Sequence, residues 1–223
     1  MGSGGVKIEA RCLQAIDLGV QGRFEAGMNL ILPAIEATAK RSLGKTRVGR
    51  TDFKNFLGQY IWLLEAFGLP GINLIESRFA TIADMDEGKP LVDPTFADLI
   101  YHVFRCSYAH GQDISDCYSF HPTAPGTAAH ASIGVDGSTL FLPESVFWSL
   151  IACVVFSKAN SDIRTVSEYY LTWDASIPLG KPTAYRFDLD MFWGGEETVK
   201  AFFEKMKIPR VQIDFRTSVA NEG

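Results

Sequence analysis

Cysteine is scarce in this chain, with four in 223 residues. Small secreted domains depend on dense disulfides, and so few thiols cannot form such a scaffold, so we expect a cytoplasmic protein with reduced cysteines. The longest apolar run, VFWSLIACVVF at 146–156, is shorter than the roughly 20 residues that cross a bilayer, and no membrane association is expected. No signal peptide is evident, and we expect residues 1–5, MGSGG, to form a flexible leader.

An overall excess of positive charge is also missing, because the net charge is −5. The field of the whole molecule therefore does not attract nucleic acid. Phosphate contacts act within about 10 Å at ordinary salt, so a local cluster can still matter. Segment 40–54 contains six basic residues and one acidic residue, Asp52. This segment is either a solvated loop between helices or an anion-facing edge, the latter formed by Lys40, Arg41, Lys45 and Arg47.

Two common catalytic motifs are absent. The tripeptide GKT at 44–46 lacks the upstream glycine of a phosphate-binding loop, because the fifth residue before Gly44 is Ala39. We therefore exclude nucleotide hydrolysis through such a loop. The sequence also has no Gly-x-Ser-x-Gly pattern, so nothing indicates a serine hydrolase of that type.

Apolar residues at helical spacing predict most of the first two thirds of the chain to be helical. We expect helices over 7–20, over 24–43 with a kink or break at Pro33, and over 51–68 with Thr51 or Asp52 as its cap. Another helix is expected over 94–110, capped by Asp93 and stopped by Gly111. Segment 143–160 is apolar almost all round, which predicts a central helix.

Strand signals concentrate late in the chain. Residues 131–142 predict a β-hairpin with its tight turn at Asp136-Gly137, whereas 112–130 is predicted to be loop. Residues 183–189, 196–206 and 209–215 predict a strand, a helix and a strand. The predicted fold class is α+β and mainly α. We expect a helical domain over 6–160, which includes the hairpin, and a small mixed β appendage over 161–223.

The octapeptide FRCSYAHG (104–111) carries the clearest candidate site. Arg105 and His110 would lie about 140° apart on an α-helix. They could act together if the last turn loosens or if a second copy of the helix supplies the partner group. An ordinary helix terminus is the alternative, because cations there oppose the helix dipole.

This pair suits the cleavage of RNA by its own 2′-hydroxyl. Histidine titrates near neutrality and can serve as base or acid. Arginine stays charged and binds phosphate through two parallel hydrogen bonds. Tyr108 and Ser107 could add hydrogen bonds to the phosphate. The reaction requires no metal or other cofactor.

The stretch DLIYHVFRCSYAHG (98–111) resembles the signature of HEPN domains, a helical family of ribonucleases and nucleotide-binding relatives. That signature is an arginine, four to six residues of which the first is usually polar, and a histidine. Arg105 and His110 match the two fixed residues, and Cys106 departs from the usual polar residue. Segment 140–155 also resembles the stretch after the motif in such proteins.

The resemblance implies a HEPN-like helical bundle and a metal-independent endoribonuclease, with Arg105 and His110 as catalytic residues. HEPN ribonucleases usually dimerise, which implies a homodimer with both pairs in one cleft, and family analogy suggests bacterial defence or a toxin–antitoxin setting with a regulatory partner. In this interpretation Tyr108 is a secondary catalytic candidate, and Lys40, Arg41, Lys45 and Arg47 guide the RNA strand.

Two other interpretations remain open. Cys106, His110, Cys117 and His121 form a C-x3-H-x6-C-x3-H pattern that could close a tetrahedral zinc site. HEPN relatives also include non-cleaving members that bind nucleotides, RNA or proteins. In such a binding module, Phe192 and Trp193 of the appendage could form a docking surface, or they could simply cover a small β core.

Overall fold

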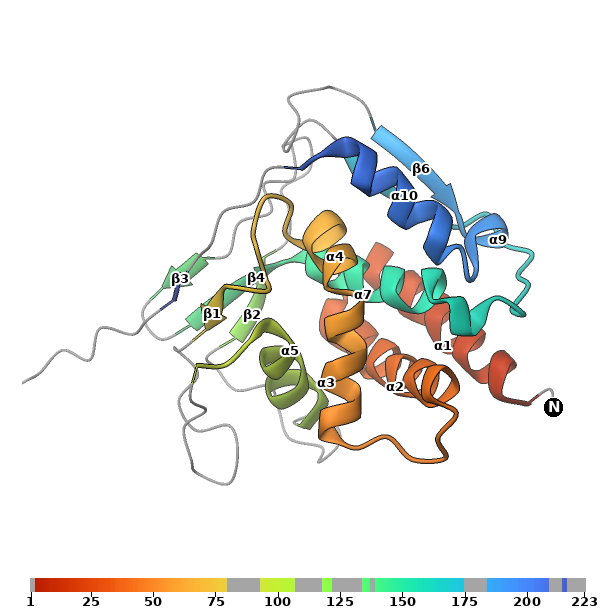
Figure 1. Ribbon diagram of the computed structural model, residues 1–223, viewed down its shortest axis with the longest axis horizontal. Helices are drawn as coiled ribbons and strands as arrows, with labels where there is room; N and C mark the ends of the chain where they lie inside the picture. The colour runs from red at the N-terminus through yellow and green to blue at the C-terminus, as the bar shows by residue number, and fades with distance from the viewer. Residues whose placement is uncertain are drawn as a thin grey trace, which may run out of the picture.

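The computed structural model describes residues 3–79, 93–106, 118–121, 134–136, 139–174, 184–208 and 214–215. These residues form a mainly helical α+β fold, as the sequence predicts, with short strands in three small sheets (Figure 1). None of the helices formed by these residues is both long and apolar enough to cross a membrane. The predicted hairpin, the central helix and the late strand–helix pair are present.

Helix α7, Glu144–Phe156, is the central helix that the apolar run predicts. It packs against α1 (Ser3–Val20), α2 (Phe24–Leu43) and the π-helix η1 (Leu64–Gly68), and all its residues from 149 to 156 are buried. Glycine allows the first two helices to approach closely. A Cβ on Gly19 or Gly27 would lie 2.5 or 2.6 Å from the Phe147 ring, so no larger residue fits there without displacing α7.

Helix α2 continues through Pro33 without a break. Proline removes the hydrogen bond to the carbonyl four residues earlier, which belongs to Asn29, an exposed residue. Water can therefore replace the missing bond. The helix ends at Gly44, whose left-handed backbone (φ 63°) is common at helix C-termini. The Lys45 N–H donates to the Lys40 carbonyl there at 3.1 Å.

The predicted helix 51–68 is divided into three parts. These are α3 (Arg50–Gln59), a turn at Tyr60, α4 (Ile61–Leu63) and η1. The predicted cap is wrong, because the N-cap residue is Gly49, whose N–H bonds the Asp52 carboxylate at 3.3 Å. The helical spacing of apolar residues in this segment predicts one buried face, and the residues of that face are all buried: Phe53, Phe56, Leu57, Tyr60, Leu63, Leu64 and Phe67.

The strands β2 (Tyr118–His121), β3 (Gly134–Asp136) and β4 (Thr139–Pro143) form one sheet in the order β2-β4-β3. The antiparallel β3–β4 pair confirms the hairpin. Asp136 pairs with Thr139 and belongs to the strand, so it is not the turn residue that the sequence predicted. The prediction of loop over 112–130 is wrong at β2, which pairs in parallel with β4.

The later part of the chain contributes β5 (Tyr170–Asp174), β6 (Ala184–Asp188), α9 (Leu189–Phe192) and α10 (Glu196–Met206). Strand β5 was not predicted, and it pairs antiparallel with β6. Aromatic rings join this layer to the bundle, because Phe203 packs 5.3 Å from Phe67 and Phe187 packs 5.7 Å from Phe156. Of the predicted strand 209–215, Asp214–Phe215 forms β7, which pairs in parallel with β1 (Arg78–Phe79).

Phe192 and Trp193 do not form the exposed docking surface considered from the sequence. Trp193 is only 5% exposed, and its indole N–H bonds the Thr165 hydroxyl at 3.1 Å. Phe192 is half-buried and packs against Phe156 and Phe187. These aromatics therefore cover the core, which is the alternative that the sequence left open.

Candidate functional site

The helix that carries the Arg105 motif begins at Thr95, not at Asp93. The Thr95 hydroxyl accepts a hydrogen bond from the Asp98 N–H at 3.2 Å, and the Asp98 carboxylate accepts one from the Thr95 N–H at 3.0 Å. This reciprocal capping box satisfies two backbone donors of the first turn. Asp93 cannot serve as the cap because it lies two residues earlier, with a positive φ of 47°.

Asp98 also joins the start of this helix to α3. Its carboxylate lies 2.6 Å from Lys54 Nζ, and both side chains are less than one third exposed. Burial tends to raise the pKa of Asp98, but hydrogen bonds from Lys54 and Thr95 outweigh it, so the pKa lies below its ordinary value. The carboxylate is therefore ionised at neutral pH and holds the first turn in place.

The motif helix is α-helical only over α5, Phe96–Leu99, and continues as the π-helix η2, Ile100–Cys106. Ile100, His102 and Phe104 are buried. The Phe104 ring lies 5.6 Å from Phe120 of β2, and the half-buried Tyr101 ring lies 5.5 Å from Phe53 of α3. These contacts fix the helix against α3 and β2, up to the residue before Arg105.

The motif helix is not an α-helix at Arg105, because the π-helix η2 includes this residue. The 140° separation assumed an α-helix, in which hydrogen bonds join residues four apart. In a π-helix they join residues five apart, so the α-helical angle does not apply within Ile100–Cys106, the segment that includes Arg105. Arg105 is described by its backbone alone, and Tyr108 and His110 lie outside the described residues.

The zinc interpretation also falls outside the structure. Of its four candidate ligands, His110 and Cys117 lie outside the described residues, and Cys106 and His121 are described by their backbones alone. Within the parts of the chain that the structure describes, no three His, Cys, Asp or Glu side chains are grouped to hold a metal ion. The cysteine–histidine pattern therefore stays a hypothesis from sequence.

The predicted RNA-guiding cations come from the end of α2 and the segment after it. Lys40 pairs with Glu36 at 2.9 Å, and Lys45 pairs with Asp52 at 2.6 Å. Arg47 is exposed. Across the described ranges it makes no hydrogen bond or ion pair. The four cations thus lie along one stretch, but an incoming phosphate would have to compete with carboxylates of the same chain for some of them.

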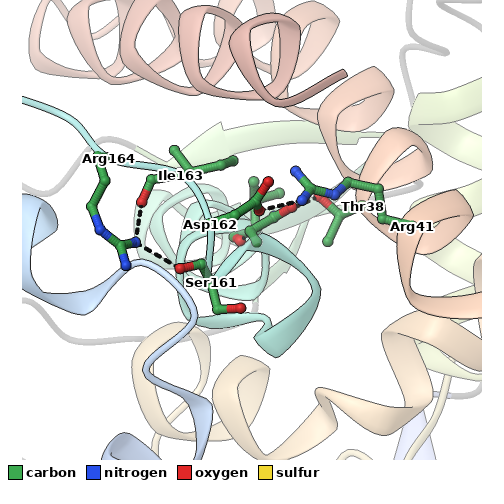
Figure 2. A network of polar contacts seen from close by, with 8 residues as sticks. Thr38, Arg41, Ser161, Asp162, Ile163 and Arg164 are labelled. Atoms are coloured by element: carbon green, nitrogen blue, oxygen red, sulfur yellow. Dashed lines mark hydrogen bonds and ion pairs between the residues drawn. The ribbon is translucent and has the colours of Figure 1, made fainter. Parts of the chain in front are cut away.

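Arg41 is held by a carboxylate 121 positions later in the chain. Its guanidinium donates to Asp162, in the turn that follows α7 (Figure 2). Arg164 closes this turn, because its Nη1 donates to the Ser161 and Ile163 carbonyls at 2.6 and 2.7 Å. The hydrogen bond from Arg41 is the main reason why the pKa of Asp162 lies below its ordinary value. Arg41 therefore has a structural partner that the sequence pattern did not reveal.

The fully buried Asn160 forms the inner part of the same connection. Its amide nitrogen donates to the Thr38 hydroxyl at 3.0 Å and to the Val154 carbonyl at 2.8 Å. Thr38 in turn donates to the Ala34 carbonyl within α2. The end of α7 is thus tied to α2 below the Arg41–Asp162 pair, which keeps the basic end of α2 in a defined position.

Sequence reasoning missed a cavity of about 490 Å³ that brings together α1, η1, α7 and β5. Its walls include Ile16, Phe67, Trp148 and Tyr170, which are spread over more than 150 positions. No local pattern links such residues. The unpredicted strand β5 supplies one whole wall of the cavity, so only the assembled fold reveals it.

A family model described as Rv1289 matches residues 7–219, which is almost the whole chain. No curated protein and no solved structure matches the sequence. The match therefore covers the helical bundle, the motif helix and the late β layer together, and the family description specifies no reaction.

Proposed function

The chain belongs to the Rv1289 family, and from its Arg105–His110 motif we propose that it is a metal-independent endoribonuclease. The 2′-hydroxyl oxygen of the substrate attacks the adjacent phosphorus, and the bond from phosphorus to the 5′-oxygen breaks. His110 takes the proton of the 2′-hydroxyl or protonates the leaving 5′-oxygen. Arg105 binds the phosphate as charge grows on its oxygens, and Tyr108 adds a hydrogen bond. The products are a 2′,3′-cyclic phosphate and a 5′-hydroxyl.

The observation that carries this proposal is the π-helical winding of Ile100–Cys106. Short π-helical segments are rare and occur frequently at functional sites, because they cost stability and re-aim side chains. Here the segment includes Arg105, the first residue of the motif, and ends at Cys106. Arg105 thus lies within a segment of the kind that often marks a functional site.

The anchoring of the motif helix supports the proposal further. A catalytic arginine must be held near its productive position. Asp98 fixes the start of the helix through Thr95 and Lys54. Phe104, the residue before Arg105, is 1% exposed and packs on Phe120. Arg105 thus follows a segment that is held on two sides.

We further propose a HEPN-like arrangement of the bundle and a homodimer in which two motif helices face one cleft. A second copy supplies another Arg105 and His110, so that one histidine acts as base and the other as acid. Lys40, Arg41, Lys45 and Arg47 then guide the RNA strand; their ion pairs lie at the surface, where such pairs contribute little stability and can exchange for phosphate. A cytoplasmic setting with an antitoxin or regulatory protein completes the proposal.

The test is a cleavage assay with the purified full-length protein and a single-stranded RNA labelled at both ends. We expect cutting to persist in excess EDTA and to leave a 2′,3′-cyclic phosphate. The all-DNA version of the same sequence should survive, because it lacks the internal nucleophile. Loss of cutting in EDTA, or cleavage of the DNA, would contradict the mechanism.

Matched variants separate chemistry from stability. Arg105→Ala and His110→Ala should abolish cutting while the melting temperature stays nearly unchanged, and the control Arg23→Ala, at an exposed arginine, should leave both unchanged. Cys117→Ser should retain activity, whereas loss of zinc and of activity together would favour the metal interpretation. RNA binding without any cleavage would favour the non-catalytic binding module.

A further inference from the structure

The cavity of about 490 Å³ between the bundle and β5 has the size of a small-molecule site. Val20 of α1 and Ile16 form one side, and Ala66, Phe67 and Pro70 at the end of η1 form another. The start of α7 and the run from Glu168 to Trp173 complete the wall. None of these residues belongs to α5 or η2, the described part of the motif helix.

Hydrogen bonds near the two ends of β5 join the elements that form the walls of the cavity. The Trp173 indole N–H donates to the Ala66 carbonyl at 2.8 Å, which joins β5 to η1. At the other end the Tyr169 hydroxyl donates to Asp17 of α1. Val20 is 73% exposed and Tyr170 is 48% exposed, so they mark an open mouth. The cavity is therefore open to solvent beside these two residues, while hydrogen bonds join the elements that form its walls.

The lining combines aromatic rings with negative charge. Five aromatic residues contribute, namely Phe67, Trp148, Tyr169, Tyr170 and Trp173, and the carboxylates of Glu144 and Glu168 join them. Among the lining residues that the structure describes, none is basic. Aromatic faces and carboxylates both attract cations, so the chemistry of the wall favours a positively charged ligand with an apolar body.

Within the described residues β5 pairs only with β6, and its other edge adds hydrogen-bond acceptors. The Leu189 N–H bonds the Tyr169 carbonyl at 3.0 Å, so Tyr169 belongs to the pairs that exchange hydrogen bonds with the β6 side. Because these pairs alternate along an antiparallel ladder, the backbone groups of Tyr170 and Thr172 point to the opposite edge. Both residues line the cavity. Their carbonyls are therefore available to an ammonium N–H.

Two nearby positive groups do not cancel this preference. Arg186 stacks over the Tyr170 ring at 3.8 Å, but its Nε is paired with Asp188 at 2.5 Å. The N-terminus of α7 carries a partial positive charge, and Glu144 lies in its first turn. Each positive group is thus matched by a carboxylate, while Glu168 has no resolved ion pair in the described structure.

We propose that this cavity binds a small organic cation, in which an ammonium group is carried on an apolar or aromatic body. The ammonium lies against Glu144 and Glu168 and donates to the outer carbonyls of β5. The apolar body fills the space between Trp148 and Phe67. This binding function is independent of the proposed ribonuclease activity.

Three matched probes test the proposal with the full-length protein: phenethylamine, 2-phenylethanol and 3-phenylpropionate. They share an aromatic body and carry positive, zero and negative charge at neutral pH. Binding is followed by calorimetry and by tryptophan emission, since Trp148 and Trp173 line the cavity. We expect phenethylamine to bind at least about tenfold tighter than the alcohol, and the carboxylate to bind weakest. Equal affinities, or no binding of the amine, would overturn the proposal.

Glu144→Gln and Glu168→Gln locate the site. Each should weaken phenethylamine binding about fivefold without changing the affinity for 2-phenylethanol. The matched control is Glu204→Gln, which removes the same charge from a second cavity of about 270 Å³ beside α10. An equal loss in this control, or unchanged amine affinity in both cavity variants, would place the ligand elsewhere and reject the assignment. RNA cleavage should remain at the wild-type level in all three variants.

Discussion

The Tyr60 hydroxyl donates to Glu196 Oε2 at 2.7 Å and lies 2.8 Å from Ser157 Oγ. Glu196 Oε2 also accepts the Lys158 N–H at 3.1 Å. This cluster joins the turn between α3 and α4, the end of α7 and the first residue of α10. Tyr60 is only 4% exposed, so water cannot easily replace its hydroxyl.

Replacing Tyr60 with phenylalanine should therefore lower the free energy of unfolding by about 1–2 kcal/mol, because buried acceptors lose their donor. Urea denaturation at pH 7 measures the change. Tyr185→Phe is the matched control, because within the described structure the Tyr185 hydroxyl makes no hydrogen bond, and it should change little. Equal effects of the two variants would mean that the cluster does not stabilise the fold.

The same residue predicts a loss of stability in alkali. Burial is the main reason why the pKa of Tyr60 lies above its ordinary value. The hydrogen bond with Ser157 lowers this pKa, and the hydrogen bond to Glu196 raises it. Below about pH 10 the tyrosine is protonated in both folded and unfolded chains. Above it, only the unfolded chain releases the proton, so stability falls as pH rises. Between pH 9 and 11 the free energy of unfolding should fall less steeply in Tyr60→Phe than in wild type. If the two curves of free energy against pH run parallel, Tyr60 is not the cause of the alkaline loss of stability.

Gly194 and Gly22 form a second matched pair. Both have left-handed backbones, with φ of 72° and 73°. A Cβ on Gly194 would lie 2.4 Å from Ser161 Cα, whereas a Cβ on Gly22 meets nothing within 4 Å. Gly22→Ala should cost about 1 kcal/mol from its backbone alone. Gly194→Ala should cost clearly more, because the Ser161 backbone must also move. Similar melting temperatures for the two variants would contradict the close approach.

Asp98→Asn should loosen the start of the motif helix. The variant loses the ionised partner of Lys54 and weakens the capping box, so we expect a loss of about 1 kcal/mol at pH 7. Because the pKa of Asp98 is lowered in the folded protein, its contribution is present above about pH 4 and disappears as pH falls further. The difference in the free energy of unfolding between Asp98→Asn and wild type should therefore shrink in acid. Asp190→Asn, at an exposed aspartate, is the control and should show no such convergence.

Asp162→Asn tests whether Arg41 guides RNA under the proposed function. The change removes the carboxylate that holds Arg41 and leaves the guanidinium available to phosphate. We expect RNA to bind about twofold to fivefold tighter at low salt, an increase that disappears as salt is raised. Arg41→Ala should weaken binding in turn. If neither variant changes RNA affinity while Arg41→Ala lowers stability, Arg41 is structural only.

Local pattern was sufficient for the main helices. Apolar spacing correctly predicted the buried stripe of α3, α4 and η1, and the continuous apolar run correctly predicted the central position of α7. It failed where pairing is long-range, because β2 pairs with β4 about 20 residues later. Of the kink or break predicted at Pro33, the break does not occur, because α2 continues through the proline and the residue whose carbonyl loses its partner, Asn29, is exposed.

The sequence by itself determined which residues carry the candidate chemistry, since the Arg105–His110 spacing and the six basic residues of segment 40–54 are properties of the chain. Only the tertiary structure decided which of these charges are already paired. Asp162 reaches Arg41 across 121 positions, and β5 meets α7 to form a cavity that no segment encodes alone. The reason is physical: periodicity reports which face of one element avoids water, whereas ion pairs and cavities depend on how separate elements meet.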